Sequence, residues 1–93
     1  MNQAKYEISV FDDDGKEYKC QLSQMSRAVL EVVIGLIMNI NAPPQYLKAG
    51  EIILNSCWVS GDSEIRENEQ LLISASMQAY KLFELKKSTL KKL

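Results

Sequence analysis

The stretch KYEISVFDDDGKEYKCQL, residues 5–22, decides the fold of this chain. Hydrophobic and polar residues alternate on both sides of the Asp14-Gly15 step, which is the pattern of strands with one buried face. The Asp-Gly step supplies the positive φ that a tight turn needs. One face would carry Tyr6, Ile8, Val10, Tyr18, Cys20 and Leu22. The sequence therefore predicts a β-hairpin over residues 5–22, and its apolar face must rest on other elements because an isolated hairpin is only marginally stable.

The segment that follows, residues 26–40, predicts a helix that provides this cover. After Arg27 it is hydrophobic except at Glu31, Gly35 and Asn39, which stand four residues apart and form one narrow stripe. Ser26, or alternatively Ser23, is a suitable N-cap. An apolar circumference of this width is typical of a helix that is covered on nearly every side.

Two more helices are expected, over residues 45–58 and 68–87. Pro43-Pro44 ends the first helix, Ser60-Gly61-Asp62 breaks the second, and residues 88–93 are expected to fray. The chain is then one α+β domain over residues 1–93, an N-terminal β-hairpin packed on about three α-helices.

Helical spacing also assigns the inward positions of these two helices. Gly35 and Gly50 each cost about 1 kcal/mol relative to alanine inside a helix, so we expect both to allow close helix approach. The inward set is Leu47, Gly50 or Ile53, Leu54, Cys57 and Trp58 in the second helix, and Leu72, Ala75, Ser76, Ala79, Tyr80 and Phe83 in the third.

The composition excludes several classes of function. Eleven basic and twelve acidic residues give a net charge of −1, which argues against a nucleic-acid or acidic-membrane partner. The chain has no histidine, the usual near-neutral acid or base and the commonest metal ligand. No cofactor is expected. The start lacks the pattern of a signal peptide, and the apolar run 28–38 is shorter than the ~20 residues of a membrane span, so we expect a cytosolic protein.

Two acidic clusters resemble functional sites only at first sight. Placing Gly15 at the sixth position of a calcium loop puts Val10 and Gln21 where carboxylates are required, so an EF-hand is excluded. The second cluster could be catalytic, but it is interrupted by Arg66 and Asn68, and carboxylates before a helix complement the helix dipole. We interpret it as the start of the third helix; its members are Asp62, Glu64, Glu67 and Glu69.

Other residues have one expected role and one alternative. Cys20 and Cys57 are expected to be buried thiols, with a bridge between them as the alternative. Trp58 is expected to be a core anchor at the end of its helix, and the alternative is that Trp58 and Tyr46 line a ligand groove. Five lysines and one acidic residue give residues 81–93 a net charge of +4 and leave −5 for residues 1–80. We interpret these lysines as the solvated end of the last helix, and the alternatives are contact with a protein or with nucleic acid.

One set of motifs suggests a family. The stretch LKAGEIILNSCWVSGD (residues 47–62), the residues LLI (71–73) and the stretch YKLFELK (80–86) follow a hairpin of the type FDDDGK (11–16). Together they resemble small prophage proteins encoded among tail-morphogenesis genes, some of which look like tail-assembly chaperones. The resemblance implies a non-enzymatic protein that shields an aggregation-prone helical partner, such as the tape-measure protein. It assigns no role to any single residue.

The surplus of apolar helix surface leads to two expectations about partners. The first is a homo-oligomer that associates through the helix 26–40, at Val29, Val33, Leu36, Ile37 and Ile40. The second is a site for an apolar helix of a partner that uses the adaptable side chains of Met25, Met38 and Met77, for which ordinary core filling is the alternative. A structural subunit of a phage tail or head connector is the rival function, and a small enzyme is disfavoured.

Overall fold

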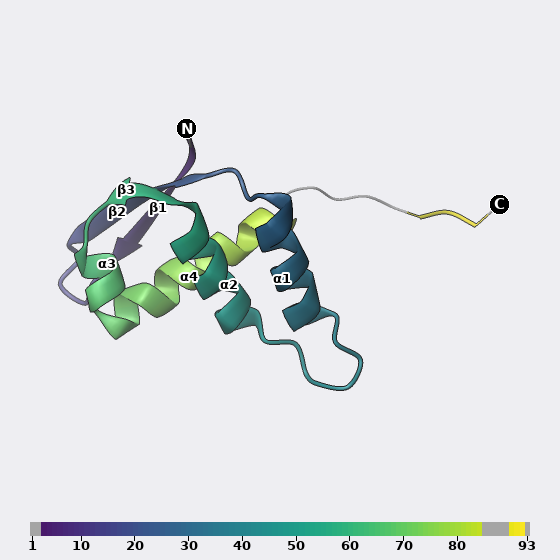
Figure 1. Ribbon diagram of the computed structural model, residues 1–93. Helices are drawn as coiled ribbons and strands as arrows, with labels where there is room; N and C mark the ends of the chain where they lie inside the picture. The colour runs from purple at the N-terminus through teal and green to yellow at the C-terminus, as the bar shows by residue number, and fades with distance from the viewer. Residues whose placement is uncertain (1–2, 85–89, 93) are drawn as a thin grey trace.

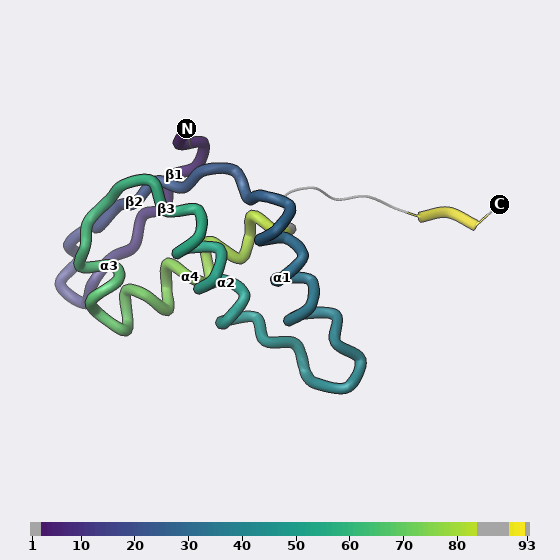
Figure 2. The backbone as a smooth tube through the Cα atoms, in the orientation of Figure 1, coloured from purple at the N-terminus to yellow at the C-terminus, as the bar shows by residue number. Residues whose placement is uncertain are grey.

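The computed structural model describes residues 3–84 and 90–92 and has an α+β architecture (Figure 1). The three strands form one antiparallel sheet in the order β1-β2-β3, and the helices pack beside it (Figure 2). The predicted fold class is confirmed. In chain order the elements are β1 (Ala4–Phe11), β2 (Glu17–Ser23), α1 (Arg27–Ile37), α2 (Tyr46–Cys57), β3 (Trp58–Gly61), α3 (Glu64–Glu67) and α4 (Glu69–Glu84).

The predicted hairpin forms from β1 and β2, with Ile8 opposite Cys20 and Val10 opposite Tyr18, and it turns around Gly15. Gly15 has φ +83°, and its N–H donates to the carbonyl of Asp12 at 3.0 Å. The Asp12 carboxylate accepts from the backbone N–H groups of Asp14 and Lys16, both at 2.9 Å. The hydrogen bond from Lys16 is the main reason that the pKa of Asp12 lies below its ordinary value. The turn is therefore held both by the freedom of glycine and by a carboxylate acting as a local acceptor.

A third strand, which the sequence did not predict, occupies the expected end of the second helix. The helix α2 ends at Cys57, and Trp58 begins β3, which pairs with β2 between Leu22 and Trp58 and between Cys20 and Gly61. A Cβ on Gly61 would lie 2.5 Å from the Cα of Cys20, and Gly61 has φ +152°. The strand is only four residues long, too short to show an alternating pattern.

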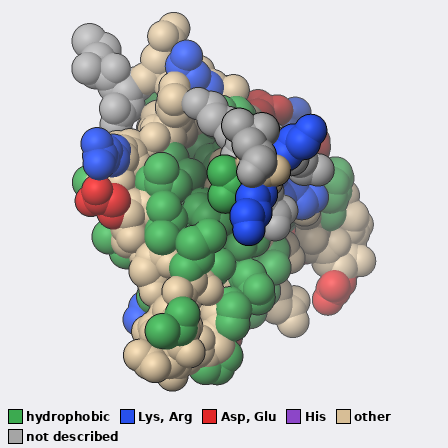
Figure 3. Space-filling view, turned by 90° about the vertical axis from the view of Figure 1, so that its right-hand side faces the viewer, with side chains coloured by type: hydrophobic (Ala, Val, Ile, Leu, Met, Phe, Trp, Pro, Cys, Tyr) green, Lys and Arg blue, Asp and Glu red, His purple; other side chains and the backbone are tan. Residues whose placement is uncertain are grey.

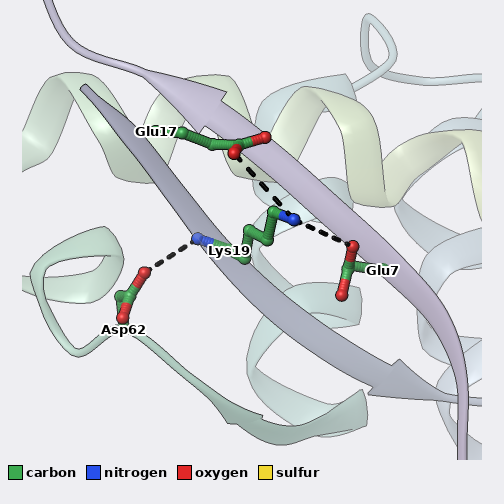
Figure 4. Close-up of polar contacts among 4 residues, drawn as sticks. All are labelled: Glu7, Glu17, Lys19 and Asp62. Carbon is green, nitrogen blue, oxygen red and sulfur yellow. Dashed lines mark hydrogen bonds and ion pairs between the residues drawn. The ribbon is translucent and has the colours of Figure 1, made fainter. Parts of the chain in front are cut away.

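Asp62 fastens this strand to its neighbour (Figure 4). Its carboxylate accepts from the backbone N–H of Lys19 at 2.9 Å, and its own N–H donates to the carbonyl of Lys19, also at 2.9 Å. The Lys19 ammonium lies 3.8 Å from Glu7 and 3.9 Å from Glu17 on the exposed face of the sheet. These exposed ion pairs add little stability, at most about 1 kcal/mol each.

The acidic segment that the sequence placed at the start of the third helix contains a separate turn of helix, α3. Its Ile65 is fully buried, and the guanidinium of Arg66 stacks 4.1 Å from the ring centre of Trp58. Asn68 then caps α4, because its side-chain oxygen accepts from the N–H groups of Gln70 and Leu71. Glu69 lies in the first turn of α4, as expected for a carboxylate near the positive end of the helix dipole.

The core lies between the sheet, α2 and α4, and it depends on the close crossing of the two helices. A Cβ added to Gly50 would overlap the backbone carbonyl of Ser76, so only glycine fits there. Gly35 has no atom within 4 Å of an added Cβ, and the expectation of a close approach at that position was wrong. The fully buried larger residues are Leu22, Ile53, Leu54, Ile65 and Val33, together with Cys20, Cys57 and Ser76.

Changing Gly15 to valine should destabilise the protein by about 1 kcal/mol or more, because valine resists positive φ. Chemical denaturation monitored by circular dichroism measures the change. Gly15→Asn is the matched control and should lose less stability, since asparagine tolerates positive φ better than valine does. An unchanged denaturation midpoint for Gly15→Val would contradict the role of the turn.

The same substitution to alanine should act with opposite signs at the two helical glycines. Gly50→Ala should destabilise by about 1–3 kcal/mol, because the methyl group has to displace the α4 backbone. Gly35→Ala should stabilise by about 0.5–1 kcal/mol, because it improves helix propensity in open space. Denaturation curves of the two variants side by side test this, and equal effects would be inconsistent with the described crossing of α2 and α4.

Candidate binding surface

The helix α1 is held on one side only, although its sequence predicted cover on nearly every side. The hydroxyl of Ser26 accepts from the N–H of Val29 at 3.3 Å and caps the first turn. Within α1 only Val33 is fully buried, and the helix packs mainly against α2. The sheet and α4 pack on other sides of α2, so α1 lies at the periphery (Figure 1), and several of its apolar side chains are exposed to solvent.

We call four of these solvent-exposed side chains the α1 apolar surface, defined as Val32, Ile34, Met38 and Ile40; Val32 and Ile34 flank the buried Val33 on opposite sides of the helix. Val32 is 51% exposed, Met38 65% and Ile40 95%. Figure 3 looks at this side of the molecule and shows hydrophobic side chains gathered across the face, with acidic groups near its edges and basic groups both at the edges and near the middle. Apolar areas of this kind on a small domain mark sites of association more often than isolated exposed residues do.

The shape of this surface depends on where α1 ends. The helix stops at Ile37, not at residue 40, and the N–H of Met38 makes the last helical bond to Ile34. The side chain of Asn39 accepts from the N–H of Asn41 and starts a turn. The N–H of Gln45 donates a hydrogen bond to the carbonyl of Leu36 at 3.1 Å. Met38 and Ile40 therefore stand on a loop that is tied back to the helix.

A shallow groove of about 920 Å³ runs along the outer side of α2, and we call it the α2 groove. Met77 of α4 and Pro44 of the loop before α2 both line it. The ring of Tyr46 packs edge-on against Tyr80 at 5.4 Å between ring centres. The lining is Pro44, Gln45, Tyr46, Leu47, Lys48, Glu51, Ile52, Asn55, Ser56 and Met77.

The residues predicted for self-association divide into three groups. Val33 is fully buried in the chain's own core, so its side chain is not available to a second molecule. Val29, Leu36 and Ile37 are half-buried and pack against the core. Ile40 is almost completely exposed. The structure thus removes Val33 from the candidate interface and adds Val32 and Ile34, which the pattern could not separate because almost every position of this segment is apolar.

The three methionines are also placed differently from one another. Met25 is half-buried against the core, which is the core-filling alternative. Met38 belongs to the α1 apolar surface and Met77 to the α2 groove. Leu47 was predicted to face the core, but it is 42% exposed and lines the groove. Tyr46 lines the same groove, whereas Trp58 is half-buried and packs against the core, as expected for a core anchor.

The two thiols of the chain are not in activating surroundings. Cys20 and Cys57 are buried free thiols, and burial raises the pKa of both, that of Cys20 to about 11. A reactive cysteine needs a lowered pKa and access to solvent. Within residues 3–84 and 90–92 no group of three or more carboxylate or thiol side chains is arranged to hold a metal ion. No helix in the same residues is long and apolar enough to cross a membrane.

Comparisons with protein-family models, with curated proteins and with solved structures found no match to this chain. The function therefore has to be inferred from the chain's own surfaces.

Both thiols should react slowly with Ellman's reagent in the native protein at pH 8 and rapidly in denaturant, because they are buried and protonated. The unfolded chain loses the Cys20 proton near pH 9, whereas the folded chain keeps it to about 11, so this thiol makes stability fall as the pH rises across that interval. Cys20→Ala should flatten that decline. Fast native labelling of either cysteine would contradict the described burial.

Proposed function

We propose that this protein is a non-enzymatic binding module that holds an apolar helical segment of a partner protein. The observation that carries the proposal is the α1 apolar surface, where Val32, Met38 and Ile40 are more than half exposed on a chain of only 93 residues. Leaving such side chains in water is unfavourable by about 25 cal/mol for each Å² of apolar area, so covering them favours association.

The α2 groove supports a helix as the bound element. Its volume is within the range of binding sites that accept several side chains. Apolar surface predominates in its lining, and Lys48 and Glu51 are among the polar residues that line it. An amphipathic helix places apolar side chains along one face and can lay them into such a groove. Met38 and Met77 suit this role because the unbranched thioether side chain adapts to different shapes.

The chemistry of the described residues supports a role without turnover. Both thiols are buried and have a raised pKa, which does not suit a nucleophile. Asp62, the most constrained member of the acidic cluster, is used to hold the backbone of Lys19. Glu64 accepts from the hydroxyl of Ser63, and Glu69 begins a helix.

The resemblance to small prophage proteins suggests a more specific role, as a tail-assembly chaperone for a long helical protein such as the tape-measure protein. A chaperone needs an apolar surface that can be occupied reversibly, and the α1 apolar surface and the α2 groove fit this need. A structural subunit of a phage tail or head connector is the second candidate. In that case, the same surface would be covered permanently, either by a neighbour or by a second copy of this chain.

Co-expression with a tape-measure protein, the kind of partner that the resemblance implies, tests the function. The partner should become more soluble and co-elute with this chain in size exclusion at moderate salt. The double variant Val32→Glu/Met38→Glu should lose the complex and keep its folded spectrum, because both side chains are exposed. Gln24→Glu is the matched control, since Gln24 is also exposed but lies outside both surfaces.

Light scattering separates the candidates. A chaperone that is free of its partner should be monomeric or in weak exchange, near its chain mass of 10.6 kDa at low concentration. A stable oligomer that Val32→Glu/Met38→Glu dissociates would favour the structural subunit. If the partner is equally soluble alone and no complex forms, the chaperone function is rejected.

A further inference from the structure

The sheet has an open edge along β1. The strand order β1-β2-β3 leaves β1 with a neighbour on one side only, although it is eight residues long, twice the length of β3. A bulge between Ala4 and Tyr6 interrupts the pairing at its beginning. The part from residue 7 to residue 11 is regular and contains no proline, so its outward backbone groups can pair with another strand.

The register identifies which backbone groups face outward. The N–H and the carbonyl of Lys19 are both bound to Asp62 on the β3 side of β2. Ser9, which lies opposite Lys19, is therefore in a non-hydrogen-bonded pair, and its own N–H and carbonyl point away from β2. The alternation along the strand extends this to Glu7 and Phe11. No hydrogen bond from α4 or from a loop in the described residues reaches these outward groups.

A furrow lies beside this edge, between β1 and α4. One cavity of about 340 Å³ is formed by the end of β1 around Phe11 and by the first half of α4, including Leu71 and Ile73. A second cavity of about 220 Å³ is formed by Tyr6 and Ile8 with the second half of α4, including Leu82. The cavities lie at opposite ends of the strand and share no lining residue with the α2 groove.

The position of α4 decides what kind of occupant fits. A second copy pairing edge to edge would bring its own α4 under the joined strands. Packed helices need about 8–10 Å between their axes, whereas paired strands lie only about 4.8 Å apart. Because α4 follows β1 along the furrow, the two helices would collide. A single extended segment, without a helix behind it, meets no such obstacle.

The charges at the two ends of the furrow define the chemistry of that segment. Lys81 lines one cavity, while Asp12 and Asp13 line the other. In the described part of the chain neither Lys81 nor Asp13 takes part in an ion pair. An acidic side chain at one end of a bound segment and a basic one at the other would complement them, with apolar side chains between them facing the cavities.

We infer that the open edge of β1 binds one extended segment of a partner protein as a fourth strand of the sheet. The backbone of Glu7, Ser9 and Phe11 supplies the hydrogen bonds, and the furrow supplies the side-chain specificity. This mode of binding by strand addition is separate from the proposed helix binding on α1 and α2, and either can fail without the other.

The probe is a labelled peptide, acetyl-KTVTVTE-amide, whose binding is followed by fluorescence anisotropy. Ser9→Pro removes one outward N–H and leaves the bonds to β2 in place, since proline is tolerated on an edge strand when its missing N–H faces solvent. Ser9→Thr keeps the N–H and is the matched control. We expect Ser9→Pro to weaken binding at least tenfold relative to Ser9→Thr, and Lys81→Glu to weaken it several-fold at low salt.

Two N-methylated forms of the peptide test the backbone contacts without changing the protein. The first form is N-methylated at every second residue, and the second form is N-methylated at the residues in between. Strand addition requires that one form loses binding and the other retains it, because only alternate N–H groups of the added strand face β1. If Ser9→Pro fails to fold by circular dichroism, this pair decides the question.

Hydrogen exchange measured by NMR gives the location. In the protein alone the amides of Glu7, Ser9 and Phe11 should exchange faster than those of Tyr6, Ile8 and Val10, and saturating peptide should slow the first three by at least tenfold. No binding at millimolar peptide, equal binding by Ser9→Pro and Ser9→Thr when both are folded, or loss of binding by both methylated forms would overturn the inference. Protection that rises with protein concentration in the absence of peptide would overturn it as well and would show a second copy at the edge.

Discussion

The close crossing of α2 and α4 at Gly50 is the contact on which the rest of the molecule depends. The missing side chain lets the backbone of α2 meet the carbonyl of Ser76, and small residues on both helices, among them Ala49, Ala75 and Ala79, continue the contact. Helices that approach this closely exclude water over a long interface without large side chains. The hydroxyl of Ser76 is buried there without a hydrogen-bond partner among the described residues, so its small size and not its polarity suits the crossing.

This crossing decides what each neighbouring element can cover. Because α4 packs on one side of α2, α1 packs on a different side of α2. The apolar side chains of α1 that do not face α2 stay in solvent. On the opposite side of the core α4 follows β1 and leaves a furrow beside it. The α1 apolar surface and the β1 edge are thus both consequences of where α4 lies. The described residues include no further helix or strand that covers either of them.

The candidate surfaces differ in how easily the sequence reveals them. Met38 was proposed from the sequence because methionine is an adaptable side chain, and the structure leaves it 65% exposed. Val33 could not be told from Val32, since neighbouring valines in a run of hydrophobic residues carry no mark of which one faces α2. Leu47 shows the same limit, because helical spacing gives the face of a helix but not which of its neighbours is present to cover that face.

Local patterns were sufficient for the hairpin, its turn and the existence of the three longer helices. Alternation around Asp14-Gly15 specifies strand pairing within one short stretch, and the need for positive φ at Gly15 is a property of the turn alone. Only the tertiary structure decided the strand β3, the opposite roles of Gly35 and Gly50, the exposure of α1 and the open edge of β1. Each of these features depends on contacts between residues that are far apart in the sequence, such as Asp62 with Lys19 and Ser76 with Gly50. Such pairings follow from the packing of all elements together, and no period in the sequence encodes them.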